Sequence, residues 1–274
     1  MGTPRQVLFG LDIDAMTLEQ VLTRSDDHLA MRRRLLIGVV NAAKVVKLHR
    51  DDLLRASLLE CDLLLADGQS VVWASKVLRR PLPERVAGID LFEKLVAKAS
   101  ADNRSIYLLG AKPDVLARLE SELSRRFPGV RIVGSRDGYF ADTESEDVAA
   151  AITASGADML FLGMTSPKKE IFLGKYADSL GVPILHGVGG SFDIFAGITK
   201  RAPRIWQRLG CEWLYRLLQE PGRLWRRYLT TNTAFLAMTL RELVHPMPSY
   251  RQHAPVVPQS NPASIARSAD TGVE

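Results

Sequence analysis

Short runs of hydrophobic residues alternate along the chain with longer stretches in which hydrophobic residues recur every three or four positions. The short runs predict buried strands, at residues 7–11, 35–40, 63–66, 106–109, 132–134, 159–162 and 183–185. The longer stretches predict amphipathic helices, at residues 91–99, 114–127, 146–154 and 168–180. This alternation is typical of an α/β protein, so we expect a Rossmann-like, mostly parallel sheet with helices on both faces.

The hydrophobic pattern changes after Ala202. Residues 203–245 carry tryptophan and leucine at helical spacing and predict a helical appendage of two helices, with Pro221-Gly222 between them. Residues 246–274 are rich in Pro, Ser, Gln and Ala, which predicts a disordered tail. We therefore expect a Rossmann-like core at 1–202, an appendage at 203–245 and a tail at 246–274.

Composition is that of an ordinary globular protein, with 46% hydrophobic and 24% charged residues in 274. Two cysteines cannot build a disulfide framework, which favours a reducing compartment. The N-terminus lacks the apolar core of a signal peptide, and no hydrophobic run reaches the length of a membrane span. These features predict a cytoplasmic location.

Positive charge is concentrated near the C-terminus. Residues 200–245 contain nine Lys or Arg against three Glu, a net charge of +6, whereas the whole chain carries +5. A basic, Trp-rich end on a neutral body favours an anionic partner. A nucleic-acid-binding protein is one alternative, but the arginines alternate with Trp and Leu at helix-core spacing and no nucleic-acid motif is present.

Polar residues and glycines follow several of the predicted strands. Asn41 follows "IGVV", Asp67 follows "LLLA" and Gly110 ends "YLLG", while "GMTSP" and "HGVGGSFD" follow two later strands. In parallel α/β sheets, ligands bind outside the carboxyl ends of the strands. The pattern therefore predicts a binding cleft along this edge of the sheet.

Asp67, followed by Gly68, has two interpretations. A carboxylate at the end of a strand can act as a general base, whereas Asp-Gly before a helical stretch also forms a good helix N-cap. Arg85 can pair with Asp67 or bind a diphosphate through its planar guanidinium. The alternative for Arg85 is a solvated loop residue.

The stretch "GVGGSFD" contains Gly187, Gly189, Gly190 and Asp193. Glycines of this kind allow a backbone to approach a phosphate or a nucleotide, or to make a structural turn. They do not lead directly from the first strand into a helix, so the dinucleotide-binding signal is weak. An NAD-dependent oxidoreductase stays an alternative on the same sheet architecture. His186 beside this stretch is either a base or, as we expect, a core histidine bonded to the backbone.

Two further motifs have structural interpretations. Asp12 and Asp14 in "LDID" resemble a metal-binding pair, but the Thr17 and Gln20 pattern that follows is a capping box, so we expect no metal there. In "GMTSPKKE", a helix is predicted to begin at Ser166-Pro167. Its first turn, with two lysines, suits either a phosphate or solvent.

Three stretches together resemble a known family. They are "DGQSVVWASKVLRRPLPERVAGIDLF", "YLLGAKPDVLARLESELSRRFPGVRIVGSRDGYF" and "GVGGSFDIFAGITKRAPRIWQRLGCEWLYRLLQEPGRLWRRYL". They resemble the WecG/TagA/CpsF glycosyltransferases, glycosyltransferase family 26. The match as a whole runs in order along the chain from about Val7 to Leu229. The resemblance implies an inverting hexosyltransferase that moves a sugar from a UDP-sugar to a polyprenyl-diphosphate-linked saccharide during exopolysaccharide or other surface glycan synthesis.

The resemblance also implies roles for individual residues. Asp67 corresponds to the family's proposed base and Arg85 to its cleft arginine, while Asn41 matches the asparagine that ends the second strand. The appendage would dock on an anionic membrane at the inner face of the plasma membrane and meet diphosphate through three arginines, Arg216, Arg223 and Arg226. Neither a cofactor nor a metal is implied, and self-association would bury the apolar appendage.

Two positions depart from the family pattern. Val39 stands where the family often has threonine, and Lys169 stands where it usually has a glutamine that faces the sugar. An ammonium group at Lys169 favours an acidic donor sugar or an added phosphate contact. The sequence therefore predicts a sugar transferase but not its donor sugar.

Overall fold

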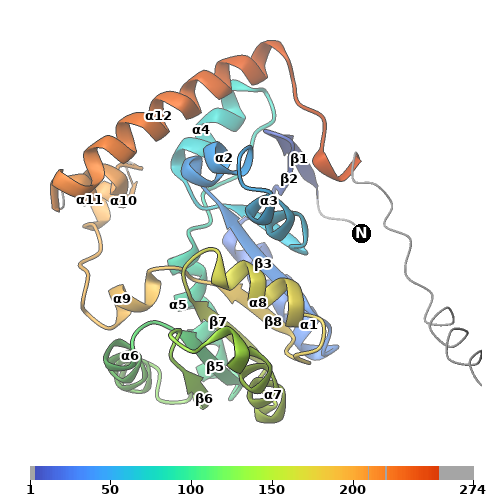
Figure 1. Cartoon of the computed structure of the whole chain (residues 1–274), viewed down its shortest axis with the longest axis vertical. Helices are drawn as coiled ribbons and strands as arrows, with labels where there is room; N and C mark the ends of the chain where they lie inside the picture. The colour runs from blue at the N-terminus through green and yellow to red at the C-terminus, as the bar shows by residue number, and fades with distance from the viewer. Residues whose placement is uncertain (1–3, 209, 220, 253–274) are drawn as a thin grey trace, which may run out of the picture.

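The computed structural model of the chain describes residues 4–208, 210–219 and 221–252 (Figure 1). Its centre is a six-stranded parallel sheet with the strand order β4-β3-β8-β7-β5-β6. The strands are β3 (Leu35–Val40), β4 (Leu63–Ala66), β5 (Ser105–Gly110), β6 (Arg131–Arg136), β7 (Met159–Gly163) and β8 (Ile184–Gly187). The predicted α/β class and parallel sheet are confirmed.

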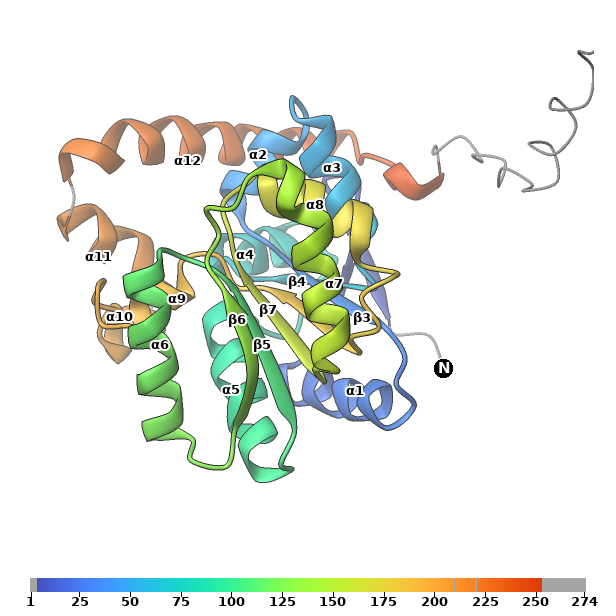
Figure 2. The same ribbon diagram turned by 60° about the horizontal axis from the view of Figure 1, so that its bottom comes forward.

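Helices cover both faces of the sheet (Figure 2). One face carries α1 (Leu18–Ala30), α5 (Gly88–Ala101), α6 (Pro113–Arg126) and α9 (Ser191–Phe195). The other carries the 3-10 turn η1 (Asp142–Glu144), α7 (Ser145–Ser155) and α8 (Lys168–Tyr176), which ends four residues before the predicted Leu180. Because successive strand side chains point to opposite faces, Ile37 packs in the first layer and Leu36 in the second.

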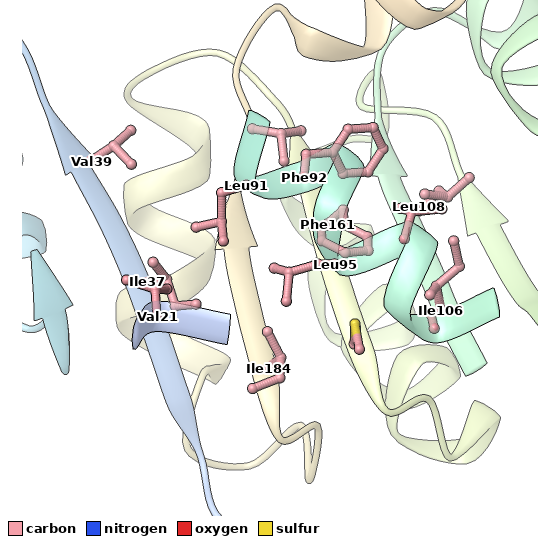
Figure 3. Packing of buried hydrophobic residues seen from close by; sticks show 14 of the residues in the cluster. Val21, Ile37, Val39, Leu91, Phe92, Leu95, Ile106, Leu108, Phe161 and Ile184 are labelled. Atoms are coloured by element: carbon pink, nitrogen blue, oxygen red, sulfur yellow. The ribbon is translucent and has the colours of Figure 1, made fainter. Parts of the chain in front are cut away.

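The core of the first layer is aromatic where α5 crosses the sheet. Phe92 packs edge-on against Phe161 of β7, with ring centroids 4.8 Å apart (Figure 3). Phe92 also contacts Phe195 of α9. A third hydrophobic cluster lies beside β4 and is formed by α2 (Ala42–Leu48), α3 (Asp52–Leu59) and α4 (Gln69–Val77) together with an N-terminal hairpin. The sheet edge at β4 is therefore covered.

The first predicted strand, residues 7–11, is wrong because the chain turns within it. The structure has a hairpin of β1 (Arg5–Leu8) and β2 (Leu11–Asp14), with Phe9 and Gly10 at positive φ in the turn. A side chain at Gly10 would come within 2.5 Å of the Tyr250 ring. Asp14 pairs with Arg5 and accepts a hydrogen bond from the Leu64 backbone, so this carboxylate joins the hairpin to β4.

The described residues of the appendage form three helices where the sequence predicts two. They are α10 (Arg204–Arg208), α11 (Glu212–Gln219) and α12 (Pro221–Val244), and α12 runs along α2 across the top of the molecule (Figure 1). Pro221 begins α12 and does not interrupt it, because a first-turn residue needs no backbone N–H donor.

The C-terminal half of α12 belongs to the core. Phe235 is 7% exposed and its ring centroid lies 5.3 Å from that of Phe9 in the hairpin turn. The Glu242 carboxylate is buried and pairs with Arg80 at 3.1 Å. Residues 246–252 are also ordered, and Ser249 donates to Asp12. The tail predicted from residue 246 is therefore wrong for 246–252, which include the 3-10 turn η2 (Tyr250–Gln252); residues 253–274 lie outside the described residues.

Replacing Phe235 with alanine is expected to lower the free energy of unfolding by about 3–5 kcal/mol, because it leaves a cavity against Phe9. Leu236→Ala, one position along the same helix, removes a side chain that is 61% exposed and should change the same quantity by less than about 0.5 kcal/mol. Urea denaturation of both variants measures the difference. Equal stabilities would show that α12 is not part of the cooperative core.

Candidate active site

The carboxyl ends of β3, β4 and β8 bring several predicted site residues together. Val40 pairs with Ala66, so Asn41 and Asp67 leave neighbouring strands at the same level. A side chain at Gly68 would come within 3.1 Å of the Asn41 Cβ, so Gly68 and Asn41 are in direct contact. Gly187 ends β8, the neighbour of β3 on its other side. The predicted cleft edge is thus a continuous rim over three adjacent strands.

Asp67 is held on this rim by one carboxylate oxygen. Its Oδ1 accepts a hydrogen bond from the backbone N–H of Gly88, the first residue of α5, at 3.0 Å. Of the two interpretations of Asp67, the helix N-cap is wrong, because α4 has Gly68 at its N-cap and no side-chain capping bond. Among the described residues, Asp67 Oδ2 has no hydrogen-bond partner. The carboxylate therefore combines a fixed orientation with one unused acceptor.

His186 contacts the same start of α5 that holds Asp67. It is fully buried, with Nε2 3.2 Å from the Gly88 carbonyl oxygen and Nδ1 3.2 Å from the Ile37 carbonyl oxygen. Burial lowers the pKa of its imidazole, which favours the neutral ring. The prediction of a core histidine bonded to the backbone is confirmed, and its contacts link β3 and β8 to the start of α5.

Lys44 lies in the site although the sequence did not single it out. Asn41 caps α2 by accepting a hydrogen bond from the Lys44 backbone N–H, and the Lys44 ammonium donates to the Val39 carbonyl at 2.7 Å. Burial and the neighbouring charge of Lys169 lower its pKa to about 8, while Asp67 acts in the opposite direction. The sequence contained one signal for this role: Lys44 stands three residues, about one helical turn, after the rim residue Asn41.

The low pKa of Lys44 predicts a specific pH dependence of stability. Because the folded pKa is below the unfolded value of 10.5, the folded state binds fewer protons between about pH 8 and pH 10.5. The free energy of unfolding should therefore rise through this window relative to Lys44→Met, by about 1–3 kcal/mol. Urea denaturation of both proteins from pH 7 to pH 10 measures the difference, and parallel curves would contradict it.

The half-buried Lys169 and the buried Glu170 form an ion pair next to β8. The Lys169 ammonium lies 3.1 Å from Glu170 Oε1, and its aliphatic stem packs over Gly187. Burial raises the pKa of Glu170, but the charge of Lys169 and local hydrogen bonds outweigh this effect and leave the pKa below its ordinary value. Glu170 Oε2 is buried and has no hydrogen-bond partner among the described residues. Glu170, Lys169 and Lys44 are among the residues that line a cavity of about 30 Å³.

The neighbouring lysine has a structural role. Lys168 donates to the carbonyl oxygens of Gly138 and Phe140 and lies 3.6 Å from the centroid of the Phe140 ring. The helix begins at Lys168, with Pro167 at its N-cap. Lys168 is therefore neither a solvated lysine nor an available phosphate ligand, unlike both interpretations of this motif.

Arg85 is paired with carboxylates other than Asp67. Its guanidinium lies 3.2 Å from Glu212 of α11 and 3.9 Å from Asp90 of α5, and its side chain is only 15% exposed. Neither an Arg85–Asp67 pair nor a solvated loop position is found. Gly210 packs against Gln69, so the appendage reaches the rim at a second point close to Asp67.

The other predicted site residues lie at different distances from Asp67 along the rim. Gly190 is the N-cap of the short helix α9, and the Asp193 carbonyl accepts bonds from Ile198 and Thr199. Gly189 adopts a positive φ of 53°. Gly110 ends β5, beyond β7, where a side chain would collide with the Gly163 backbone at 2.4 Å. The loop after β8 therefore lies nearer the Asp67 region, whereas Gly110 ends a strand four positions from β4 in the sheet.

The appendage arginines are described only in part. Arg226 is exposed on α12, with its guanidinium 5.3 Å from the Trp225 ring centroid. The side chains of Arg216 and Arg223 lie outside the described part of the structure. Within the described residues, no group of three His, Cys, Asp or Glu is placed to hold a metal ion.

Comparison with known families decides the class of this protein. The profile of the Glycosyl transferase WecG/TagA/CpsF family matches residues 6–248, which include the rim, the core and α12. The chain belongs to the WecG/TagA/CpsF family. This WecG/TagA/CpsF protein is accordingly a glycosyltransferase of cell-surface glycan synthesis with sugar-donor and acceptor substrates, and the assignment selects glycosyl transfer over the oxidoreductase and nucleic-acid-binding alternatives.

The transferase has no described helix that is long and apolar enough to cross a membrane. Several large hydrophobic side chains are nevertheless exposed on its appendage. They are Ile205, Trp213, Leu218, Trp225, Leu229, Leu236, Leu240, Leu243 and Val244. Those on α12 recur at intervals of three, four or seven residues and form one hydrophobic stripe, defined here as Trp225, Leu229, Leu236, Leu240 and Leu243.

Proposed function

We propose that this transferase moves a hexosyl group from a UDP-sugar to a polyprenyl-diphosphate-linked saccharide, with inversion, in exopolysaccharide or other surface glycan synthesis. One observation carries the proposal: Asp67 lies on the carboxyl rim of the sheet with one oxygen fixed by Gly88 and the other without a hydrogen-bond partner among the described residues. Within a glycosyltransferase, an oriented carboxylate with an open acceptor is suited to deprotonate a hydroxyl.

In the proposed reaction, Asp67 takes the proton from the acceptor hydroxyl as its oxygen attacks the anomeric carbon. The bond to UDP breaks on the opposite face, so the configuration inverts. Oxygen and nitrogen groups around the rim would hold the donor. We assign this role to Asn41, Gly68, Gly110, Lys169, Gly187, Gly189, Gly190 and Asp193.

The leaving UDP develops negative charge that must be neutralised in a desolvated cleft. We assign this task to Arg85 and to the appendage arginines Arg216, Arg223 and Arg226, and we expect no metal or other cofactor to be needed. Arg85 supports this assignment because it is largely buried and already holds the carboxylate of Glu212. Guanidinium groups bind phosphate through the same planar pairs of donors that bind carboxylate.

We further propose that the enzyme acts as a peripheral protein on the inner face of the plasma membrane. The hydrophobic stripe of α12, with Arg226 exposed among its residues, suits an interface with anionic lipid. Such a position would bring the active site to a lipid-linked acceptor. Self-association through the same stripe is a second way to cover it.

The direct test is a panel of UDP-sugars incubated with the full chain and a polyprenyl-diphosphate disaccharide, read by mass spectrometry. One UDP-sugar is expected to give an acceptor longer by one hexosyl unit, with the same yield in the presence of a chelator. No transfer from any UDP-sugar would overturn the donor class. Transfer that disappears on chelation and returns with manganese would overturn the assignment of the arginines as the only neutralising groups.

A further inference from the structure

Four charged side chains meet where the appendage contacts the start of α5. Arg85 and Arg201 provide two guanidinium groups, and Asp90 and Glu212 provide two carboxylates. Arg201 Nη2 lies 2.7 Å from Asp90 Oδ1 and 3.8 Å from Glu212 Oε1, and Arg85 contacts the same two residues. The cluster has no net charge and is partly shielded from solvent, with side chains that are 15–34% exposed.

The cluster adjoins the rim residue Asp67. Asp90 lies in the first turn of α5, and the first N–H of that helix, at Gly88, holds the Asp67 carboxylate. Val86, the residue after Arg85, donates its backbone N–H to Ala66 at the end of β4. The Arg85 and Arg201 guanidiniums, which share Asp90 and Glu212, therefore lie in the region where a leaving diphosphate would be released.

Two nitrogens of the Arg201 guanidinium lack a hydrogen-bond partner among the described residues. Its Nε is buried and has no hydrogen-bond partner among the described residues. Its Nη2 is close to Asp90 but lacks the alignment of a hydrogen bond. Buried guanidinium donors are normally satisfied, because an unpaired one loses its hydration without compensation. The unmatched donors indicate that the cluster is built for a ligand with more acceptor oxygens than the two carboxylates supply.

We propose that Arg201 is a second diphosphate-binding residue beside Arg85, and that Glu212 occupies the place of the diphosphate until the donor binds. The inference rests on the proposed function, since it takes a nucleoside diphosphate as the ligand. A diphosphate brings several terminal oxygens and two or more negative charges, whereas Glu212 brings one charge. Exchange of Glu212 for diphosphate satisfies Arg201 Nε and releases the contact that ties α11 to Arg85.

The exchange also couples the appendage to the donor. Glu212 begins α11, which packs on α12 through Trp213 and Tyr228, with ring centroids 5.7 Å apart. Release of Glu212 frees the first turn of α11 from the core while the C-terminal half of α12 stays anchored by Phe235.

The first test is calorimetric titration of the full chain with UDP and, separately, with uridine. Arg201→Gln is expected to weaken UDP binding about ten- to a hundredfold, the loss of one or two charge-assisted hydrogen bonds, and to leave uridine binding unchanged. Arg34→Gln is the matched control, because Arg34 also pairs with two aspartates, Asp62 and Asp178, but lies just before β3 at the opposite edge of the sheet.

The outcomes separate this inference from the proposed function. Wild-type protein that fails to bind UDP would overturn both. Wild-type binding that Arg201→Gln leaves unchanged would overturn only the role of Arg201. Equal losses for UDP and uridine would mark Arg201 as a structural residue and would also overturn the inference.

The second test replaces the competing carboxylate. Glu212→Gln keeps the size and hydrogen-bonding capacity of the side chain but removes its charge, so UDP should bind about three- to tenfold more tightly than to wild type. A merely structural Glu212 would instead position Arg85 and Arg201, and its replacement would weaken UDP binding. Tighter binding supports the exchange, and unchanged or weaker binding overturns it.

Discussion

Asp67→Asn is expected to leave the fold intact and to lower the transfer rate by about 10²- to 10⁴-fold, the contribution of a positioned general base. The amide oxygen of asparagine can still accept the hydrogen bond from the Gly88 N–H that Asp67 Oδ1 accepts at 3.0 Å. An amide cannot take up the proton of the acceptor hydroxyl. UDP binding should therefore stay within about threefold of wild type while turnover falls.

The measurement is single-turnover transfer from the donor found in the UDP-sugar panel, together with the thermal unfolding midpoint. Asp137→Asn is the matched control, because this carboxylate follows β6 on the same edge of the sheet and accepts a bond from the Tyr139 backbone, but lies at the far end of the strand order. Turnover near the wild-type rate in Asp67→Asn would remove Asp67 from the mechanism.

A second large effect is expected from the hydrophobic stripe. Replacement of Leu229, Leu236 and Leu240 by serine should reduce partition onto vesicles that contain anionic lipid by about a hundredfold. These side chains are 56–61% exposed, and partial burial of each leucine in lipid contributes about 1 kcal/mol. The structure favours this test over deletion after Ala202, because deletion would also remove Phe235 from the core.

The matched control changes three hydrophobic residues elsewhere on the surface, Met31, Leu53 and Ile171, which are 39–63% exposed. Vesicle sedimentation should be normal for the control and lost for the stripe variant, and transfer to a water-soluble acceptor should be retained in both. A stripe variant that sediments like wild type would contradict the membrane proposal. Loss of a dimer from the stripe variant, with no change on vesicles, would assign the stripe to self-association.

Local patterns were sufficient for most of the sheet. A buried parallel strand is a short apolar run, and for that reason five of the seven predicted runs fall inside an observed strand. A sixth, at residues 183–185, begins one residue before β8. The first run was wrongly predicted as a strand because Phe9-Gly10 is a turn that contains a hydrophobic residue. This turn is buried against Phe235 and Tyr250 from the other end of the chain. Composition likewise misplaced the start of the tail, since Ser249 is held by Asp12.

The sequence by itself determined the α/β class, the alternation of strands and helices, the position of Asp67 at a strand end and the family resemblance, because these depend on neighbours in the chain. Only the tertiary structure decided which hydrogen-bond or ion-pair partner each charged side chain has. Asp67 is held by the start of α5 and not by α4, Arg85 pairs with Glu212, and the half-buried Lys44 lies near the charge of Lys169. Electrostatic partners depend on distances of a few ångströms between segments far apart in sequence, which no local pattern encodes.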